Sequence, residues 1–467
     1  MFLRKNTSSK TGRTFLSIVQ GYRADGKSKQ RTVQKVGYLD VLQKEYPDPV
    51  AHFSAVAAEM EQERLATKNL TITLDLDSQI ERNAANRKNY GHIVFSKIYH
   101  ELEIHRFLKN ARRHETFAFN TDAIMRLLVY TRLLYPGSKR ASILLKENFF
   151  DSFKFSLDDI YNALAHFDKI STSLQRHLHE MVTKQYKRET DLIYYDVTNY
   201  YFETEHEDEL RKKGYSKEHR RSPIVQMGLA LDKQGLPISY KLFKGNTHDS
   251  QTLMPVLVEI VRDYGAKRVI AVADKGLNSG DNIVFNTALG HGYVFSQSVR
   301  GASEELKNYI LNEAGYEQIG TDYKRKSRII PVTIQYSPEP GKKKKVQLDQ
   351  KQVVFYSEKY AKRAKHKRAE VLRKAADLIA NPSKYKRTTA QGAAGYISGL
   401  AFDKKTGEVL DTGTALVLNE EKIREEEKMD GYYAIVTSEL DEQDDKIIEL
   451  YRGLWRIEES FKITKFR

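Results

Sequence analysis

Three acidic residues, Asp196, Asp274 and Glu458, have the types and positions that a metal-dependent enzyme needs. Asp196 and Asp274 each end an apolar, strand-like segment, whereas Glu458 lies in the apolar stripe of a helix. Burying a lone carboxylate is costly, so each is expected to have a partner. Hard oxygen ligands suit Mg²⁺ or Mn²⁺, and two such ions roughly 3.5–4 Å apart promote in-line displacement at phosphorus. The sequence therefore predicts phosphodiester chemistry on two divalent cations.

The segments that would position the two aspartates form a regular series. Strands are predicted at residues 192–198, 223–232, 236–243 and 268–274, and a further one at 293–299. A helix that Asp249 or Ser250 caps is predicted between the third and fourth, ending at Tyr264 and Gly265. This order resembles a ribonuclease H-like core. Sites in parallel sheets gather at the carboxyl ends of strands, where both aspartates fall.

Glu458 is the sharpest of the three clues. At helical spacing its neighbours are Tyr451, Leu454 and Phe461, so Glu458 is expected to point with them toward the core. A buried ion pair with Lys or Arg is the simpler reading of Glu458 alone, but the two aspartates favour a shared metal site. Lys465 follows two turns later on the same face and is suited to hold a phosphate.

Composition limits the classes of protein that remain. Lys and Arg number 77 against 62 Asp and Glu among 467 residues, and the formal net charge of +15 favours an anionic partner such as nucleic acid. The absence of cysteine excludes disulfides, thiolate zinc sites and cysteine nucleophiles. No apolar run approaches the about 20 residues that span a membrane, and the N-terminus lacks a signal peptide's hydrophobic core. We expect a cytoplasmic protein without a membrane partner.

The remaining segments suggest five parts in all. Residues 1–45 read as a basic β unit with strands at 13–22 and 30–38 and a turn at Asp25 and Gly26, for which DNA contact and a solvated hairpin are equally probable readings. Residues 46–190 are mainly helical, with one helix starting at Ser156. The first part of the core occupies residues 191–300, and a basic insertion occupies 301–430. Residues 431–467 complete the core with the last strand and a single helix that carries Glu458.

The insertion carries most of the concentrated positive charge. It contains a run of four lysines at 342–345, a predicted strand at 352–356 and a strongly basic helix from 358 to about 380. The helix bases include Arg363, Lys367 and Arg368. Such a run is usually a solvated face, but within a nuclease-like core phosphate contact is the better interpretation.

The residues around Glu458 carry a family resemblance. The segment 451–465 resembles the Tyr, Arg, Glu, Lys signature of bacterial insertion-sequence DDE transposases of the IS-four superfamily, in the branch of insertion sequence sixteen-thirty-four. Tyr451, Glu458 and Lys465 match its spacing, whereas Leu454 stands at the usual Arg position. The segments 194–198 and 273–277 are similar to the two Asp motifs of that family, and 245–249 to a segment between them.

The resemblance implies a fold, an activity and partners. The fold class is α/β, a ribonuclease H-like catalytic core with a large insertion, preceded by a small β unit and a helical domain. The implied activity is Mg²⁺- or Mn²⁺-dependent cleavage and strand transfer at the terminal inverted repeats of double-stranded DNA, by a homodimer in a synaptic complex at the bacterial nucleoid. Asp196, Asp274 and Glu458 would be catalytic metal ligands, and five residues would contact DNA: Tyr451, Arg452, Arg456, Lys465 and Lys275.

Two other functions stay open at this point. Members of the family usually continue well beyond the Glu helix, so the chain reads as truncated after Arg467. A truncated derivative would bind the repeats without catalysis. A ribonuclease H-like nuclease would cut without strand transfer.

Overall fold

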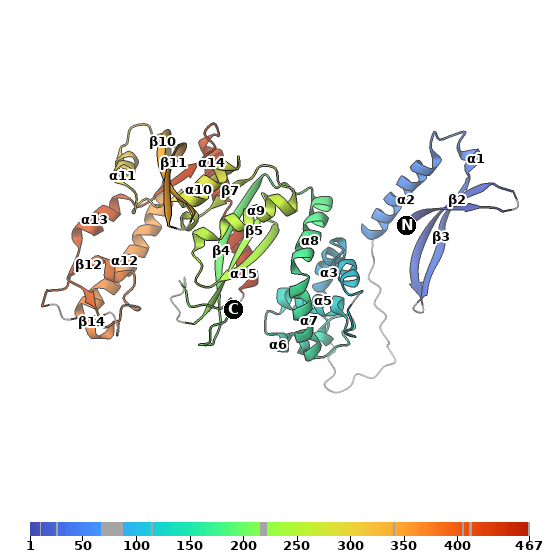
Figure 1. Cartoon of the computed structure of the whole chain (residues 1–467), viewed down its shortest axis with the longest axis horizontal. Helices are drawn as coiled ribbons and strands as arrows, with labels where there is room; N and C mark the ends of the chain where they lie inside the picture. The colour runs from blue at the N-terminus through green and yellow to red at the C-terminus, as the bar shows by residue number, and fades with distance from the viewer. Residues whose placement is uncertain are drawn as a thin grey trace. The chain divides into compact units, whose positions relative to one another are not determined.

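The chain folds into two compact units, residues Met1–Ala84 and Ala85–Arg467 (Figure 1). The structure is a computed structural model and describes residues 1–9, 11–24, 27–66, 87–113, 115–214, 222–339, 341–403, 406–410 and 413–465. The predicted hairpin turn at Asp25 and Gly26 lies outside these residues, as does the end of the chain at Arg467.

The first unit is a three-stranded antiparallel sheet in the order β1-β2-β3. Its strands are β1 (Phe2–Thr7), β2 (Thr14–Ala24) and β3 (Lys27–Tyr38). The last two confirm the predicted strands, whereas β1 was not predicted. The helices α1 (Leu39–Leu42) and α2 (Pro49–Ala66) follow. Leu16 and Ile18 are fully buried, and Ala57 of α2 is buried too, so α2 belongs to this compact unit although the sequence grouped it with the helical domain.

The second unit begins with a helical part. Its helices are α3 (His92–Glu101), α4 (Ile104–Ala111), α5 (Thr121–Leu134), α6 (Lys139–Leu144), α7 (Leu157–Lys169) and α8 (Ser171–Tyr186). They enclose a core that includes Ile124, Leu127 and Ile160. The predicted start at Ser156 is confirmed: its side chain accepts a bond from the Asp159 amide, and Asp159 accepts one from the Ser156 amide.

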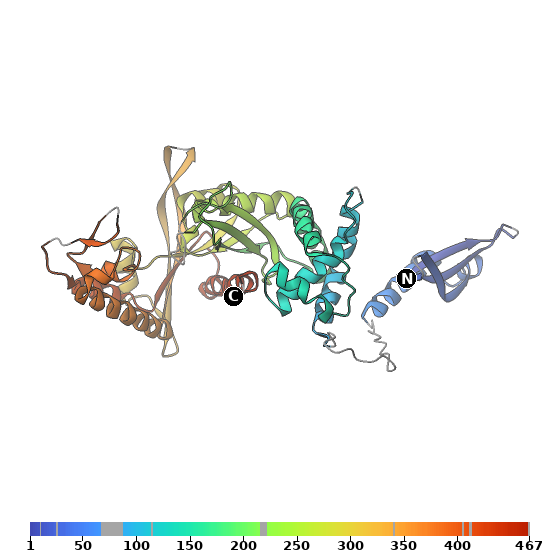
Figure 2. The ribbon, with the colours of Figure 1, turned by 90° about the horizontal axis from the view of Figure 1, so that it is seen from below.

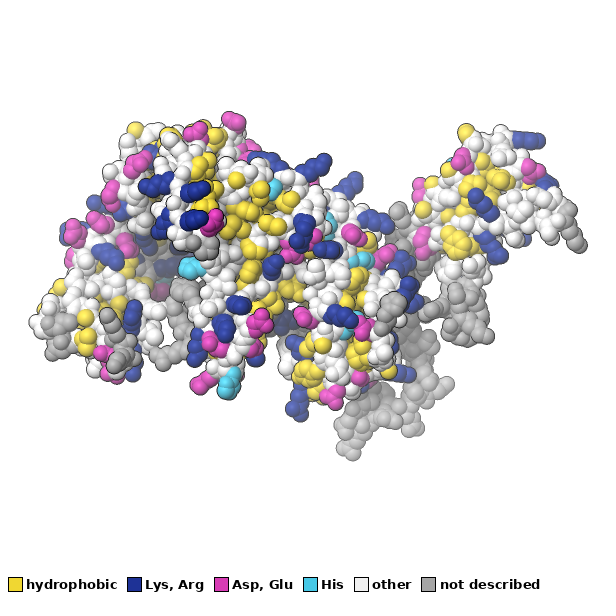
Figure 3. Space-filling model, viewed as in Figure 1, with side chains coloured by type: hydrophobic (Ala, Val, Ile, Leu, Met, Phe, Trp, Pro, Cys, Tyr) yellow, Lys and Arg dark blue, Asp and Glu magenta, His cyan; other side chains and the backbone are white. Residues whose placement is uncertain are grey.

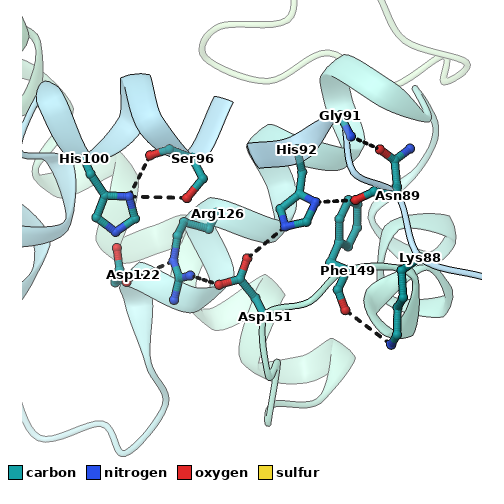
Figure 4. A network of polar contacts seen from close by, with 10 residues as sticks. All are labelled: Lys88, Asn89, Gly91, His92, Ser96, His100, Asp122, Arg126, Phe149 and Asp151. Carbon is teal, nitrogen blue, oxygen red and sulfur yellow. Dashed lines mark hydrogen bonds and ion pairs between the residues drawn. The ribbon is translucent and has the colours of Figure 1, made fainter. Parts of the chain in front are cut away.

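An ion network ties α5 to the rest of the helical part (Figure 4). Arg126 of α5 pairs with Asp122 through Nε at 3.1 Å and with Asp151 through Nη1. The Tyr99 hydroxyl donates to Asp122 Oδ1 at 2.9 Å. Burial alone would lower the pKa of Arg126, but the two carboxylates raise it overall. We call Asp122, Arg126 and Asp151 the α5 ion network.

The centre of the second unit is a mixed sheet of nine described strands. Their order is β6-β5-β4-β7-β8-β16-β11-β10-β9. The first six in sequence are β4 (Leu192–Tyr201), β5 (Ile224–Leu231), β6 (Pro237–Lys244), β7 (Ile270–Ala273), β8 (Gly292–Gln297) and β9 (Glu317–Ile319). The others are β10 (Tyr323–Glu339), β11 (Lys342–Ser357) and β16 (Tyr432–Thr437). Pairing is parallel between β4 and β7 and between β7 and β8, and antiparallel elsewhere.

Helices cover both faces of this sheet, each burying a separate apolar cluster. On one face the helices are α9 (Leu253–Tyr264) and α10 (Gly280–Ala288), which pack on strand residues such as Ile193 and Tyr195. On the other face they are α14 (Asp444–Arg452) and α15 (Trp455–Thr464), which pack on Leu192 and Tyr194. Helix α9 ends at Gly265 as predicted, but its N-cap is Thr252, because Asp249 and Ser250 lie in a preceding 3₁₀ turn.

The segment 301–430 is less separate from the core than the sequence suggested. It adds α11 (Glu304–Leu311) and the strands β9, β10 and β11, and the last of these pairs directly with β16. Strands β10 and β11 form a long twisted ribbon that extends beyond the other strands (Figure 2). Basic side chains gather over this ribbon in Figure 3. The lysines 342–345 of β11 are exposed. The sequence had predicted only the second half of β11.

Beyond the ribbon lies a small lobe built on the basic helix α12 (Glu358–Ala380), whose predicted bounds are confirmed. The lobe also holds β12 (Ile397–Ser398), β13 (Ala401–Phe402), β14 (Val409–Leu410), β15 (Val417–Leu418) and α13 (Glu420–Lys428). Arg368, expected among the exposed bases of α12, is buried and pairs with Asp430 and Glu427. Among the described residues no helix is long and apolar enough to cross a membrane.

Candidate metal centre

Asp196 lies where the parallel pairing between β4 and β7 ends. The pairing runs from Leu192 opposite Ile270 to Tyr194 opposite Val272. Continued for two more residues, the same register would set Asp196 opposite Asp274, which follows β7 and keeps an extended backbone with φ −79° and ψ 169°. Neighbouring strands are about 4.8 Å apart, so this register predicts that the two aspartates lie near each other. Asp196 does not end its strand as predicted, because β5 continues to pair with β4 up to Tyr201.

Asp274 is exposed, and its carboxylate accepts bonds from two hydroxyl groups. Ser296 Oγ donates to Asp274 Oδ1 at 2.7 Å, and the Tyr451 hydroxyl donates to the same oxygen at 3.3 Å. Burial raises the pKa of Tyr451, so its hydroxyl keeps its proton and remains a donor at neutral pH. Both donors are uncharged, and they hold the carboxylate without neutralising it.

The two aspartates share the face of the sheet that α14 and α15 cover. Side chains alternate along a strand, so Asp196 lies on the side of Tyr194, and Asp274 on the side of Val272. Tyr194 and Val272 both pack in the cluster with Ile457 and Phe461 of α15. This is the face that also carries the Glu458 helix.

The predicted single C-terminal helix is interrupted at Gly453, which separates α14 from α15. A Cβ atom at Gly453 would lie 2.0 Å from the Tyr194 hydroxyl oxygen, so only glycine permits this approach to β4. On the next turn Arg456 Nη1 donates to that hydroxyl at 3.3 Å and to the carbonyl of Lys233 at 3.4 Å. The start of α15 is thus fixed against the sheet by backbone proximity and by Arg456.

Glu458 is exposed, which corrects the expectation that it points into the core. The buried positions of α15 are Ile457 and Phe461, one turn apart, and Glu458 lies on the flank of that stripe. Because water reaches its carboxylate, Glu458 pays no burial penalty and needs no buried partner. Its neighbour Glu459 pairs with Lys462 at 2.5 Å, whereas no ion pair of Glu458 is found among the described residues.

Asp196 and Asp274 therefore follow the paired part of two neighbouring parallel strands, and Glu458 lies on a helix over the same face of the sheet. Within the described ranges, no group of three or more His, Asp or Glu side chains lies close enough to hold a metal ion. The oxygen donors of Asp196 and Asp274 fit a hard divalent cation. Glu458 is not gathered with them in this conformation.

The predicted DNA-contacting residues surround this site in different environments. Lys275 directly follows Asp274 and is exposed, as is Arg452, whose guanidinium lies over the Tyr323 ring at 5.4 Å. Lys465 Nζ lies 5.8 Å from the centre of the Tyr200 ring. Tyr451 and Arg456 are partly buried and already engaged by Asp274 and Tyr194 respectively.

Further positive charge approaches from the lobe and from the end of β8. Tyr433 of β16 stacks on Phe355 at 5.5 Å, and burial raises its pKa. The charges of Arg363 and Arg300 lower that pKa, and the charge of Asp274 raises it. Tyr433 is therefore within electrostatic reach of both the basic helix and the acidic site.

Ser296 is the residue of this site that the sequence did not reveal. It follows the apolar segment of β8, and the parallel pairing of Ala273 with Phe295 puts the next pair, Asp274 and Ser296, side by side. A polar residue at the end of an apolar strand was the available signal, but only the strand register shows which aspartate it contacts.

Comparisons with known proteins give consistent family matches. Residues 189–467 match the family described as Transposase DDE domain, and residues 3–69 match IS1634 family transposase, N-terminal domain. No curated protein matches. One similar solved structure is the piggyBac transposase synaptic complex with hairpin DNA, at 13% identity and TM-score 0.26, covering 56% of this chain and 61% of that chain. Another is the Mos1 transposase paired-end complex with left transposon end, at 14% identity and TM-score 0.17, covering 39% of this chain and 60% of that chain. The chain thus spans less than two thirds of either structure's chain.

Proposed function

The chain belongs to the DDE transposases, in the branch of the IS1634 transposases, and we propose that it binds the terminal inverted repeats of an insertion sequence and catalyses DNA cleavage and strand transfer there. The observation that supports this proposal is the parallel register of β4 and β7, which, continued by two residues, would set Asp196 opposite Asp274 on the face covered by α15. Two adjacent carboxylates with oxygen ligands only are suited to phosphoryl transfer on divalent metal ions.

The strand order supports a ribonuclease H-like core. Counted along the chain from β4, the strands β6-β5-β4-β7-β8 have the order 3-2-1-4-5, with an antiparallel meander followed by two parallel additions. This arrangement places the ends of the first and fourth strands next to each other, as the proposed site requires. Residues 301–430 then form the large insertion between the second Asp and Glu458.

We assign the metal-ligand roles to Asp196, Asp274 and Glu458. Two Mg²⁺ or Mn²⁺ ions, when bound, would activate the attacking oxygen and stabilise the leaving one. Asp196 and Asp274 would supply the fixed side of the site, because Asp196 lies on β4, Asp274 directly follows β7, and Ser296 and Tyr451 hold one oxygen of Asp274. Glu458 supplies the third carboxylate from α15, where its side chain is exposed.

The reaction has two steps at one site. In the first, water attacks the phosphorus at the end of the element, the bond to the 3′ oxygen breaks, and a 3′-hydroxyl is released. In the second, that hydroxyl attacks a phosphodiester of the target DNA, and the displaced 3′ oxygen leaves. One phosphodiester bond is formed for the one broken in the second step, so no external energy source is needed.

Basic residues around the site would hold the DNA. Lys275 directly follows Asp274 and Tyr451 contacts it, the exposed Arg452 ends α14, and Arg456 and Lys465 lie in α15 and at its C-cap. Because Tyr451 and Arg456 also bond to the protein, we expect their effect on DNA to include the position of α15. The N-terminal unit and the helical part would recognise the ends, and a homodimer would pair two ends at the nucleoid.

A cleavage and joining assay tests this function. Labelled duplexes that carry the repeats flanking the gene are incubated with the protein and Mg²⁺, alone and with a target plasmid. We expect strand cleavage at the repeat end and transfer of the label to the plasmid. Specific binding without cleavage would show a catalytically inactive DNA-binding derivative. Cleavage without transfer would show a nuclease.

A further inference from the structure

Among the described residues, Ser296 makes the shortest side-chain hydrogen bond to the proposed metal ligand Asp274. Its hydroxyl donates to Asp274 Oδ1 at 2.7 Å, which is the usual length of a strong O–H···O bond. Ser296 is 6% exposed, so water competes little for this hydrogen bond. The contact joins the end of β8 to the loop that follows β7.

The backbone around Ser296 is fixed independently of its hydroxyl. Ser296 lies opposite Ile435 in the pairing of β8 with β16, and its carbonyl accepts a bond from Asn278 Nδ2 at 3.0 Å. Asn278 ends the 3₁₀ turn that begins after Asp274. The strand and the turn are therefore held without the side chain, which leaves the hydroxyl free to act on Asp274.

The choice of donor matters for the chemistry of the site. A lysine or arginine at this position would pair with Asp274 and compete with a metal ion for its negative charge. A hydroxyl instead restricts the rotation of the carboxylate and leaves its charge in place. The Tyr451 hydroxyl reaches the same oxygen at 3.3 Å, so both neutral donors act on Oδ1.

We propose that Ser296 is a positioning residue, which orients the carboxylate of Asp274 through Oδ1 so that its other oxygen faces the metal ion. This inference rests on the proposed function, because it needs Asp274 to be a metal ligand. Removing a partner of this kind typically weakens metal binding by about 10-fold to 100-fold.

Direct binding of Mn²⁺ to the full chain tests the proposal without a catalytic readout. Free Mn²⁺ is titrated by electron paramagnetic resonance with the unmodified protein and with Ser296→Ala, Ser296→Thr and Asp274→Asn. The matched control is Ser298→Ala, two residues further on and exposed. We expect Ser296→Ala to weaken Mn²⁺ binding about 10-fold, and Ser296→Thr, which keeps a hydroxyl, and Ser298→Ala to leave it unchanged.

The outcomes separate this inference from the proposed function. Equal Mn²⁺ binding by the unmodified protein and Asp274→Asn would overturn the metal role of Asp274. Loss of binding in Asp274→Asn with unchanged binding in Ser296→Ala would overturn only the role of Ser296. If circular dichroism shows that Ser296→Ala is unfolded, Ser296→Cys, a weak donor of similar size, decides the matter in the same way.

Discussion

Asp122 and Asp274 are held by neighbouring side chains in opposite ways. In the α5 ion network, Asp122 accepts bonds from the Tyr99 hydroxyl and from Arg126, whose positive charge it shares with Asp151. At the end of β7, Asp274 accepts bonds from the hydroxyls of Ser296 and Tyr451. One carboxylate is paired with a cation of the protein, and the other is only oriented.

This difference separates a structural carboxylate from one that remains available to a ligand. An arginine stabilises the ionised form of its partner and uses the attraction to hold two helices or loops together. Hydroxyl donors fix the direction of a carboxylate and leave its charge for an external cation. Among the described residues no ion pair of Asp274 with Lys or Arg is found, and this supports its assignment as a ligand.

The largest expected effect follows from removing the charge of Asp274. Asp274→Asn should lower the rate of DNA cleavage by about a thousandfold, because metal ions supply several kcal/mol of transition-state stabilisation. Asp196→Asn should do the same, and both should leave end binding in a gel-shift assay largely intact. The rate is measured with labelled repeat ends under single-turnover conditions.

Asp122→Asn provides the comparison from the α5 ion network. It removes the same charge in the same way, but it should loosen the helical part and leave the cleavage rate of the folded protein nearly unchanged. An equal loss of cleavage in Asp122→Asn and Asp274→Asn would show that the two carboxylates do not differ in role.

Glu458 is expected to have the next largest effect. Glu458→Gln should lower cleavage by about a hundredfold through loss of a metal ligand, with no change in stability because the side chain is exposed. Glu459→Gln is the matched control, since Glu459 is the adjacent exposed carboxylate and pairs with Lys462. Similar cleavage rates for the two variants would remove Glu458 from the site.

Arg126→Leu should produce a smaller effect of a different kind. Asp122 and Asp151 would lose their shared cation, and since their side chains are 22% and 23% exposed, we expect a cost of about 2 kcal/mol, below that of a fully buried pair. Hydrogen exchange of α5 amides measures this local loss, with Arg140→Leu, an exposed arginine of α6, as the control. Unchanged protection in Arg126→Leu would show that the network does not hold α5.

Much of the fold could be predicted where apolar runs are continuous. Strands β5 and β6 and helix α12 were predicted within about one residue of their observed ends. Strand β10 was missed because it alternates exposed and partly buried residues and contains Pro331, which lacks an amide hydrogen. Its pairing with β11 puts Pro331 opposite Asp349, in a ribbon whose stability comes from cross-strand partners distant in sequence.

The site was predicted in part, for a similar reason. The position of Asp274 after a short apolar strand followed from a local pattern that the structure keeps, whereas β4 continues past Asp196 to Tyr201. The burial of Glu458 was wrong because the helical period assumed one unbroken helix, whereas contact of Gly453 with Tyr194 interrupts it. That contact joins α15 to β4, which is distant in the sequence. The proposed role of Ser296 also depends on a contact between distant segments, because the register of β7 and β8 sets which aspartate it meets.

The smallest expected effect is a dependence on pH that acts on the helical part. His166 of α7 is buried against Phe117, and both its ring nitrogens are without a hydrogen-bond partner among the described residues. Burial lowers its pKa below the ordinary value of about 6.5, although Glu115 opposes the shift. Its folded form therefore binds fewer protons than its unfolded form. The contribution of neutral His166 to the free energy of unfolding is therefore fully present above about pH 6.5, and it falls as the pH drops toward the lower pKa of the folded state.

His166→Gln should reduce this acid sensitivity. The fall in α7 hydrogen-exchange protection between about pH 7.5 and about pH 5.5, corrected for the intrinsic rate, should be smaller in the variant. His206→Gln, at an exposed histidine, should keep the fall of the unmodified protein. Because His166 contacts Phe117 and Glu115 within the helical part, Mn²⁺ binding should be the same in both variants at about pH 7.5. A shift in Mn²⁺ binding with His166→Gln would mean that the helical part and the site are coupled. The carboxylates of the two regions would then not act independently of each other.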